Sequence, residues 1–498
     1  MRSLAQERTL PSAGLQAALV VGCGLVLAWL IVSQPMPLLF VGLGGLALII
    51  IFLQRPDLGL LLTLIIRASS DTLIGRMSSA AGGGIAARML SSPNAGLVLL
   101  VIFGGAVYLL NHRSRILSLP GAVSLVFLLV AGTIGLIRAP SFTAALDRWF
   151  ADWSALIVYA LAAAIFWKPQ QIQKVVNVFA VAFIAPAAVG LYQLVSKQGC
   201  KVDEADLLRI CGTFIHPNPF AFFLVIIFSV FLCQALVQRG GRKLLALSIV
   251  ATAAILLIST QTRVGWAGAL IVLLTVGAVR NRRVLLLVPV LIVAAMLFLP
   301  SFHQRVTDPF SEAGGSFGSR RDIWNTGVAN WLGATSDDSP FVTVLNRIAG
   351  TGPESVTAFT GGLAAHNDYL YIFLEYGALG LVAFVLMLVS LTVSAYRIWR
   401  RTTDPDMKTV ALSFFALTLA FPVMHLTDNL VGRTQNQLYF WTLAGLTAAI
   451  GQMTIRAKQR VPSAPGQTRL METRPAHQPE DRFEPRGRIR PGGAATPL

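Results

Sequence analysis

Residues 218–238, NPFAFFLVIIFSVFLCQALVQ, contain no charged side chain and end against Arg239. A helix that crosses the hydrocarbon core of a bilayer needs about 20 mostly apolar residues, so this run predicts a membrane span. Similar runs recur along the chain, and the weakest of them, at 57–67, is too short to cross alone. The predicted spans number fourteen: 15–33, 37–53, 57–67, 95–110, 119–137, 150–167, 174–195, 218–238, 244–260, 264–279, 284–300, 368–395, 409–426 and 437–454. We therefore expect an all-α fold, a multi-pass transmembrane helical bundle with about 12–14 spans.

Composition and charge agree with this fold class. The chain is 55% hydrophobic and 13% charged, about half the charged fraction of soluble domains, which excludes a soluble protein. Lys and Arg gather in cytoplasmic loops of membrane proteins, so their distribution predicts orientation. With the N-terminus inside, 26 of the 40 Lys and Arg residues lie on the cytoplasmic side, and the net charge of +17 divides into +18 inside and −1 outside. Topology thus explains the basic composition, and we expect no nucleic-acid partner.

The runs and loops divide the chain into five parts. We expect N-terminal transmembrane helices in 1–148, a transmembrane core in 149–300, a large outside loop in 301–365, C-terminal transmembrane helices in 366–455, and a cytoplasmic tail in 456–498. The tail is rich in Pro and Arg, which predicts disorder and contact with anionic lipids. In the large loop, Arg320–Trp331 (RRDIWNTGVANW) has helical apolar spacing. It predicts a short helix on the membrane surface or over a cavity mouth.

Two of the four cysteines, Cys200 and Cys211, fall in a loop assigned to the outside. Two cysteines in one oxidising loop can close a small ring, and the alternative is a pair of free thiols. Neither has a nearby CxxC or CxxH partner, which argues against a metal site.

Polar residues at the outer ends of spans are the candidate functional residues, since ionisable groups at membrane depth are costly. Arg209 precedes Gly212–Phe220, where two prolines force irregular backbone that is tolerated there only against protein or a wet cavity. We predict that Arg209 binds an anion, with His216 and Asn218 as secondary candidates. The alternative for Pro217 and Asn218 is a plain helix cap.

Arg263 lies in the polar hinge Ser259–Arg263 between two apolar runs. Its planar guanidinium suits phosphate oxygens, and we predict that it binds one. The alternative is an interfacial arginine that extends to the headgroups. Arg320 and Arg321 in the large loop can add charge, although a solvated pair is the simpler interpretation.

His366 opens the long apolar run that follows the large loop. Asn367 or Asp368 is a natural helix N-cap, which needs no further function. An imidazole at a helix entrance can exchange a proton near neutral pH, so His366 is the catalytic candidate, with Asn367 as a secondary one. A purely structural histidine is the alternative.

Taken together, these residues resemble the O-antigen ligase and O-antigen polymerase superfamily of bacterial polysaccharide ligases and polymerases, over about residues 149–451. The resemblance rests on the order of modest motifs: Arg209 with Gly212-Thr213-Phe214 and His216-Pro217-Asn218, Gln261-Thr262-Arg263, a large loop with Arg320, Trp324 and Gly350-Thr351-Gly352-Pro353, then His366-Asn367, Tyr369-Leu370, Tyr376-Gly377 and Gly380. Three features depart from it: fourteen spans instead of about a dozen, the stretch 336–347 ahead of the glycine turn, and the basic tail.

The resemblance implies a GT-C-like membrane glycosyltransferase of the bacterial inner membrane, with its active site and large loop on the periplasmic face. It implies transfer of a glycan from an undecaprenyl diphosphate carrier to a glycan, lipid or protein acceptor, without metal, cofactor or nucleotide sugar. By position, Arg209 and Arg263 would hold the diphosphate of this lipid-linked oligosaccharide donor, and His366 would lie beside the acceptor. We expect the loop with its Gly350–Pro353 turn to act as a lid that recruits the acceptor.

Three alternatives differ in the function that they assign. A polymerase of O-antigen or exopolysaccharide shares the donor and the site chemistry of a ligase. A polysaccharide or lipid transporter shares the many spans, but transporters tend to have internal repeats and midplane sites, whereas the polar candidates here lie at the outer rim. A structural membrane protein explains neither the arginines nor His366.

Overall fold

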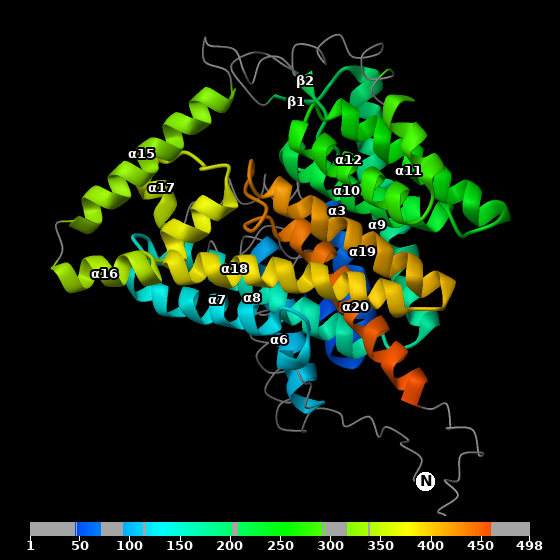
Figure 1. Ribbon diagram of the computed structural model, residues 1–498, viewed down its shortest axis with the longest axis horizontal. Coiled ribbons are helices and arrows are strands. Elements are labelled where there is room, and N and C mark those ends of the chain that lie inside the picture. Colours follow the sequence, from blue (N-terminus) through cyan, green and yellow to red (C-terminus); the bar gives the residue numbers. More distant parts are fainter. Residues whose placement is uncertain are drawn as a thin grey trace, which may run out of the picture. The chain divides into compact units, whose positions relative to one another are not determined.

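The computed structural model describes residues 45, 47–70, 93–112, 116–201, 208–290, 293, 316–336 and 339–459 (Figure 1). The predicted span 15–33, most of 37–53 and 284–300, and nearly all of the tail lie outside the described residues. The disordered-tail prediction falls there as well.

The described chain is helical, and the predicted multi-pass helical fold is confirmed. Its helices are α3 (Pro56–Ser69), α6 (Pro93–Asn111), α7 (Ala122–Gly135), α8 (Phe142–Ile165), α9 (Pro169–Ser196), α10 (Pro217–Ala235), α11 (Gly240–Ser259), α12 (Arg263–Val279), α15 (Ser316–Ser336), α16 (Pro340–Ala349), α17 (Ser355–Phe359), α18 (Asp368–Arg401), α19 (Pro405–Met424) and α20 (Thr434–Gln459), with short 3₁₀ turns at Ile116–Ser118, Leu136–Arg138 and Arg282–Leu286. A small ribbon, which the sequence does not predict, pairs β1 (Cys200–Lys201) with β2 (Leu208–Arg209) in antiparallel register.

Seven of these helices are long and apolar enough to cross a membrane: α8, α9, α10, α11, α18, α19 and α20. Shorter apolar helices lie at Val101–Asn111, Ala122–Arg138 and Arg263–Val279. The weak run at 57–67 forms α3, whose 14 residues reach about 21 Å, less than the ~30 Å of a bilayer core. The chain is thus a multi-pass membrane protein over the residues that the structure describes.

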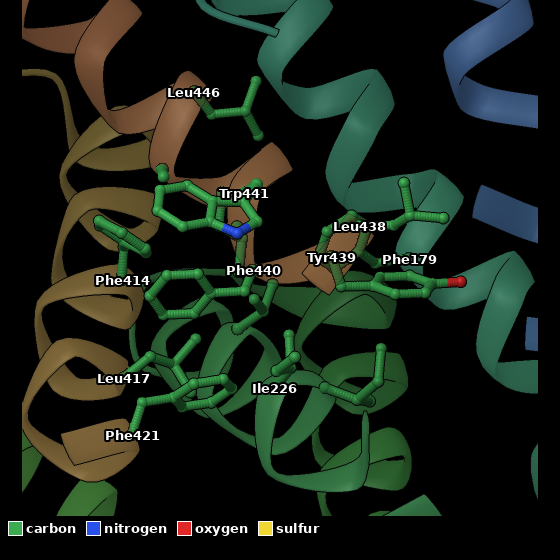
Figure 2. Packing of buried hydrophobic residues seen from close by; sticks show 14 of the residues in the cluster. Phe179, Ile226, Phe414, Leu417, Phe421, Leu438, Tyr439, Phe440, Trp441 and Leu446 are labelled. Carbon is green, nitrogen blue, oxygen red and sulfur yellow. The ribbon is translucent and has the colours of Figure 1, made fainter. Parts of the chain in front are cut away.

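Helix α10 lies at the centre of the core. It is buried over its whole apolar window and packs against α11, α12 and α19. Aromatic side chains from α9, α19 and α20 close the core around it (Figure 2). The ring centroids of Phe179 and Tyr439 lie 5.0 Å apart, and those of Phe421 and Phe440 lie 4.6 Å apart and are stacked. A helix that is apolar all round is expected to be enclosed in this way.

A buried ion pair within α8 is hydrogen-bonded to Tyr376 of α18. The Nε atom of Arg148 donates to Oδ1 of Asp152 at 2.9 Å, and the Tyr376 hydroxyl donates to Oδ2 of Asp152 at 2.9 Å. The guanidinium of Arg148 also lies 4.9 Å from the ring centroid of Tyr371. Because these charges are paired and hydrogen-bonded, they can lie inside the bundle.

The large loop folds back onto α18 through two tryptophans of α15. Trp331 is 2% exposed and contacts Phe373, and the Trp324 indole donates to the carbonyl of Ala365. Two positions were predicted for this helix, on the membrane surface or over a cavity mouth. These contacts place it against the protein, which favours the second position. An exposed apolar stripe occurs instead on α16, where Phe341, Val344, Leu345 and Ile348 are all at least 39% exposed.

The glycine turn of the loop is locked against a break in α18. Gly377 has φ +69° inside the helix, and Gly350 has φ +77°. A Cβ atom on Gly350 would lie 2.1 Å from the Glu375 carbonyl oxygen, and one on Gly377 would lie 2.2 Å from the Ile348 oxygen. The Gly352 N–H donates to the Glu375 oxygen at 3.0 Å. Only glycine fits such approaches, so this turn is the anchor of the loop and not its moving part.

Candidate active site

A buried carboxylate, Asp428, is the centre of the site. It lies in the turn between α19 and α20 and is 2% exposed. Its Oδ1 atom accepts from the Asn429 N–H at 2.7 Å and lies 3.4 Å from Nδ1 of His366. Its Oδ2 atom accepts from the amide of Asn218. Asp428 therefore links the start of α10 to the residue that precedes the N-cap of α18.

The electrostatic surroundings keep Asp428 ionised. Burial raises the pKa of this carboxyl, but the hydrogen bond and charge of His366, the Asn429 N–H and the charge of Arg433 lower it more, so the net pKa lies below the ordinary value. A buried anion beside an imidazole fixes which ring nitrogen carries the proton. Asp428 thus favours a proton on Nδ1 of His366.

His366 is partly open to solvent, with 32% of its side chain exposed. Its backbone is left-handed, with φ +49°, a conformation that is uncommon for a residue other than glycine. The following residue, Asn367, is the N-cap of α18 and accepts from the Leu370 N–H at 3.0 Å, while its own N–H donates to Asn429. Since Nδ1 faces Asp428, Nε2 is the nitrogen left for a substrate.

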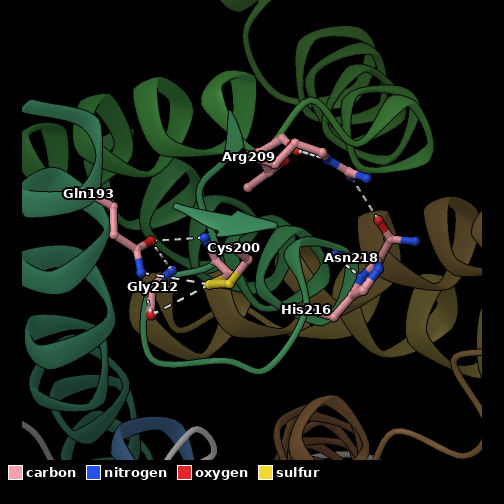
Figure 3. Close-up of a disulfide and its surroundings, with 8 residues drawn as sticks. Gln193, Cys200, Arg209, Gly212, His216 and Asn218 are labelled. Atoms are coloured by element: carbon pink, nitrogen blue, oxygen red, sulfur yellow. Dashed lines mark hydrogen bonds between the residues drawn. A yellow bond between two sulfur atoms is a disulfide. The ribbon is translucent and has the colours of Figure 1, made fainter. Parts of the chain in front are cut away.

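The guanidinium of Arg209 forms hydrogen bonds with other residues of the protein (Figure 3). Arg209 is 7% exposed. Its Nε donates to the Thr260 carbonyl at 2.8 Å, and its Nη2 donates to Oδ1 of Asn218 at 3.0 Å and to Oγ1 of Thr262 at 2.9 Å. Arg209 therefore orients Asn218, which in turn holds Asp428, and it brings a fixed positive charge to the site.

A disulfide between Cys200 and Cys211 closes the segment that carries Arg209, with Cα atoms 6.0 Å apart (Figure 3). Gln193 of α9 holds the same segment, because its Oε1 accepts from the N–H groups of Cys211 and Gly212 at 2.9 and 2.8 Å. These contacts fix β2 against α9. Because a two-residue ribbon is only weakly stable by itself, the disulfide and Gln193 are needed to hold β2, and with it Arg209, in place.

His216 is the N-cap of α10, and its Nδ1 accepts from the Asn218 N–H at 3.1 Å. Burial, followed by the charge of Arg209, lowers the pKa of His216 to about 4, and the nearby Asp428 opposes this shift only in part. His216 is therefore neutral near pH 7. Its role is that of a cap, with its charge state set by the same residues that surround His366.

Three helix N-termini meet at this place. Asn218 lies in the first turn of α10, Thr262 is the N-cap of α12, and Asn367 is the N-cap of α18. The Thr262 hydroxyl contacts both Arg209 and Asn218. The N-terminus of a helix has free N–H groups and a partial positive charge, so several together suit an anion.

The other predicted arginines lie around this centre. Arg263 is the first residue of α12, directly after Thr262, and is half-buried. Arg320 reaches over from α15, where its Nη1 donates to the Thr427 carbonyl at 2.8 Å, next to Asp428. Burial lowers the pKa of Arg320, and Asp428 opposes the shift. Arg321 is exposed.

A second pair, Asp368 and His425, supports the turn that carries Asp428. Both are buried, and Oδ2 of Asp368 accepts from Nδ1 of His425 and from the N–H groups of Leu430 and Val431. One carboxylate thus fixes the backbone on both sides of Asp428. This pair lies beneath the site and has no exposed ring nitrogen comparable to that of His366.

The sequence alone assigned no role to Asp428, Thr260 or Thr262. The available signal was spacing: Thr427-Asp428-Asn429 is a polar break between two apolar runs, as is the hinge that contains Arg263. Which two breaks meet in space depends on helix packing, which spacing does not determine.

In a comparison with protein families, residues 247–385 match the family model described as O-Antigen ligase. The matched region runs from α11 into α18 and contains Arg263, Arg320 and His366, whereas Arg209 and Asp428 lie outside it. A comparison with curated proteins finds no match. The region of this multi-pass helical membrane protein that carries the loop and His366 is thus similar to the O-antigen ligase family.

Proposed function

We propose that this membrane enzyme of the O-antigen ligase type transfers a glycan from a polyprenyl diphosphate, such as undecaprenyl diphosphate, to an acceptor hydroxyl. The reaction takes place on the outer, periplasmic face of the bacterial inner membrane. The observation that carries the proposal is the pairing of the partly exposed His366 with the buried Asp428, whose Nδ1 and Oδ1 atoms lie 3.4 Å apart. Such a pair, set where helix N-termini and arginines converge, suits proton transfer beside an anionic leaving group.

In this mechanism His366 is the general base. Its Nε2 accepts the proton of the acceptor hydroxyl while the hydroxyl oxygen bonds to the anomeric carbon of the glycan. Asp428 accepts the hydrogen bond of Nδ1–H and stabilises the imidazolium that forms. The bond from the anomeric carbon to the phosphate oxygen breaks, and its electron pair leaves on the lipid diphosphate. Attack opposite the leaving group inverts the anomeric carbon.

The diphosphate needs positive charge where the electron pair arrives. Arg263, at the N-terminus of α12, is the residue that we assign to direct contact, since a guanidinium can bind phosphate with two parallel hydrogen bonds. Arg209, with three of its hydrogen bonds on the protein, contributes charge and orients Asn218. Arg320 is a further candidate from the loop side. The proposal needs no metal or cofactor.

The acceptor distinguishes a ligase from a polymerase. A ligase passes a finished glycan to a lipid, glycan or protein, and a polymerase passes a growing chain to another lipid-linked repeat. Deletion of the gene separates them: long lipid-linked chains without attachment indicate a ligase, whereas single repeats on the cell surface indicate a polymerase. Unchanged surface glycan on a gel would contradict both functions.

The test of the catalytic assignment is His366→Ala in proteoliposomes that contain lipid-linked oligosaccharide donor and acceptor. Loss of a general base is expected to reduce the transfer rate by about 10²- to 10⁴-fold. His112→Ala is the control, since His112 lies at the end of α6 and hydrogen-bonds only to the carbonyl of its own helix. A His366→Ala variant that inserts normally and transfers glycan at the parental rate contradicts the mechanism.

Arg263→Lys tests the diphosphate contact. Lysine keeps the charge but loses the planar pair of donors. We expect a fall in turnover of at least tenfold, whereas Arg321→Lys, on the exposed side of α15, should remain within twofold. If Arg263→Lys matches the parental turnover, direct two-point binding of the diphosphate is wrong.

A further inference from the structure

A polar cavity lies at the other end of α18. Its volume is about 200 Å³, and residues from α10, α12, α18 and α19 line it, among them Trp399, Arg280 and Lys408. A single water needs only about 15 Å³ of such space, so the cavity admits a larger polar group. Trp399 follows Asn367 by 32 residues, about 48 Å along the helix at 1.5 Å per residue. The cavity is therefore distinct from the candidate active site.

Two cations, Arg280 and Lys408, border this cavity. Among the described residues, neither the Arg280 nor the Lys408 side chain forms an ion pair. The two nearest acids in the sequence are engaged elsewhere. Oδ1 of Asp404 caps α19 by accepting from the Met407 N–H at 2.9 Å, and Oδ1 of Asp406 accepts from the Gln238 amide at 2.9 Å. Like charges that share a cavity favour a bound anion.

The rest of the wall can also donate hydrogen bonds. Trp399 is 6% exposed, and its indole N–H has no acceptor among the residues that the structure places. An indole nitrogen can only donate, so a buried one without an acceptor is unfavourable. Thr403 adds an exposed hydroxyl, and α19 begins at Pro405 in the wall, with the positive end of its dipole there.

We propose that this cavity is a phosphate-binding site at the cytoplasmic end of the bundle, with Arg280 and Lys408 as its two cationic ligands. The distribution of Lys and Arg predicts the orientation of the chain in the membrane, and this orientation places Arg280 and Lys408 on the cytoplasmic side. The phosphate belongs either to an anionic lipid headgroup of the inner leaflet, where such lipids attract basic residues, or to a soluble phosphate. This site is independent of the proposed transferase function.

Binding is measured on the full chain, purified in detergent. Native mass spectrometry reports retention of phosphatidylglycerol against phosphatidylcholine, and a thermal-shift titration reports inorganic phosphate. The test variant is Arg280→Gln/Lys408→Gln. The matched control is Arg242→Gln/Lys243→Gln, which removes two exposed cations at the start of α11 outside the cavity. Arg280→Lys/Lys408→Arg exchanges the two cations and reports on folding.

The cavity pair should lose affinity by about fivefold per cation, roughly 25-fold for both, while the control and the exchanged pair stay within threefold. If Arg280→Gln/Lys408→Gln loses affinity for phosphatidylglycerol, the ligand is a lipid phosphate. If it loses affinity for inorganic phosphate alone, the ligand is a soluble phosphate. The proposal is overturned if the parent binds neither probe, or if Arg280→Gln/Lys408→Gln, folded with an unchanged melting temperature, binds as the parent does.

Discussion

Replacement of Asp428 by asparagine changes one atom of the side chain and removes its charge. In the folded protein, three donors approach this carboxylate: the Asn218 amide, the Asn429 N–H and Nδ1 of His366. Asparagine offers one oxygen and an NH₂ group, so one donor must face another donor. The arrangement that relieves this conflict turns the new NH₂ toward His366, which then accepts at Nδ1 and carries its proton on Nε2.

A histidine with its proton on Nε2 cannot take a proton from an acceptor hydroxyl. We therefore expect Asp428→Asn to reduce kcat by about 10²- to 10⁴-fold, which corresponds to about 3–5 kcal/mol in activation free energy. The Asn429 N–H loses its acceptor in this arrangement, and the hydrogen bonds of Asp368 to the N–H groups of Leu430 and Val431 should keep the turn folded. The cost in stability is expected to be about 1–3 kcal/mol, the usual cost of one unsatisfied buried group.

The assay is transfer from lipid-linked oligosaccharide to acceptor in proteoliposomes, followed by gel separation of the product. Asp322→Asn is the matched control, because Asp322 lies exposed on α15 and loses the same charge without a buried contact. Photo-crosslinking of donor to the variant separates binding from chemistry. If Asp428→Asn transfers glycan within threefold of the parent while donor binding is unchanged, Asp428 does not control His366 and the proposed mechanism fails.

Three further variants test how the site is built. The pKa of His216 is about 4 in the folded protein and about 6.5 in the unfolded chain, so stability is lost as the pH falls below 6.5. Between pH 7 and pH 5, the free energy of unfolding of the parent should fall by about 1 kcal/mol more than that of His216→Asn, after allowance for solvent screening. Melting curves at the two pH values measure this difference. Gly350→Ala should destabilise by roughly 3 kcal/mol or more, against about 1 kcal/mol for Gly361→Ala, which has φ +66° but open space; equal melting temperatures would contradict the locked turn. Replacement of Cys200 and Cys211 by serine should lower the free energy of unfolding by roughly 3 kcal/mol. Reductant should lower the activity of the parent and leave the activity of the double serine variant unchanged.

The apolar runs predicted the helices because burial in a bilayer imposes a length and a composition that sequence records directly. The run at 218–238 and helix α10 (Pro217–Ala235) coincide within a few residues. Helix α8 begins at Phe142, eight residues before the predicted start at 150, because Asp147 and Arg148 interrupt the apolar pattern there. The pairing of Arg148 with Asp152 makes its charge tolerable, and pairing depends on packing.

The sequence predicted several residues of the candidate site but not the contacts between them. His366 and Arg209 were selected because ionisable groups at span ends are costly. The contact between His366 and Asp428 joins positions 62 residues apart, and the three hydrogen bonds of Arg209 join it to residues as far as 53 positions away. Neither pairing leaves a periodic trace in one sequence.

The joint between the glycine turn and α18 also bears on how acceptor preference can change. Its contacts are made by backbone atoms of Gly350, Gly352, Glu375 and Gly377, so they are indifferent to the side chains elsewhere in the loop. Exposed side chains of α16, such as Phe341 and Val344, can therefore vary between related chains while the turn is kept. Under the proposed function, such variation would alter acceptor preference while His366 and Asp428 stay in place.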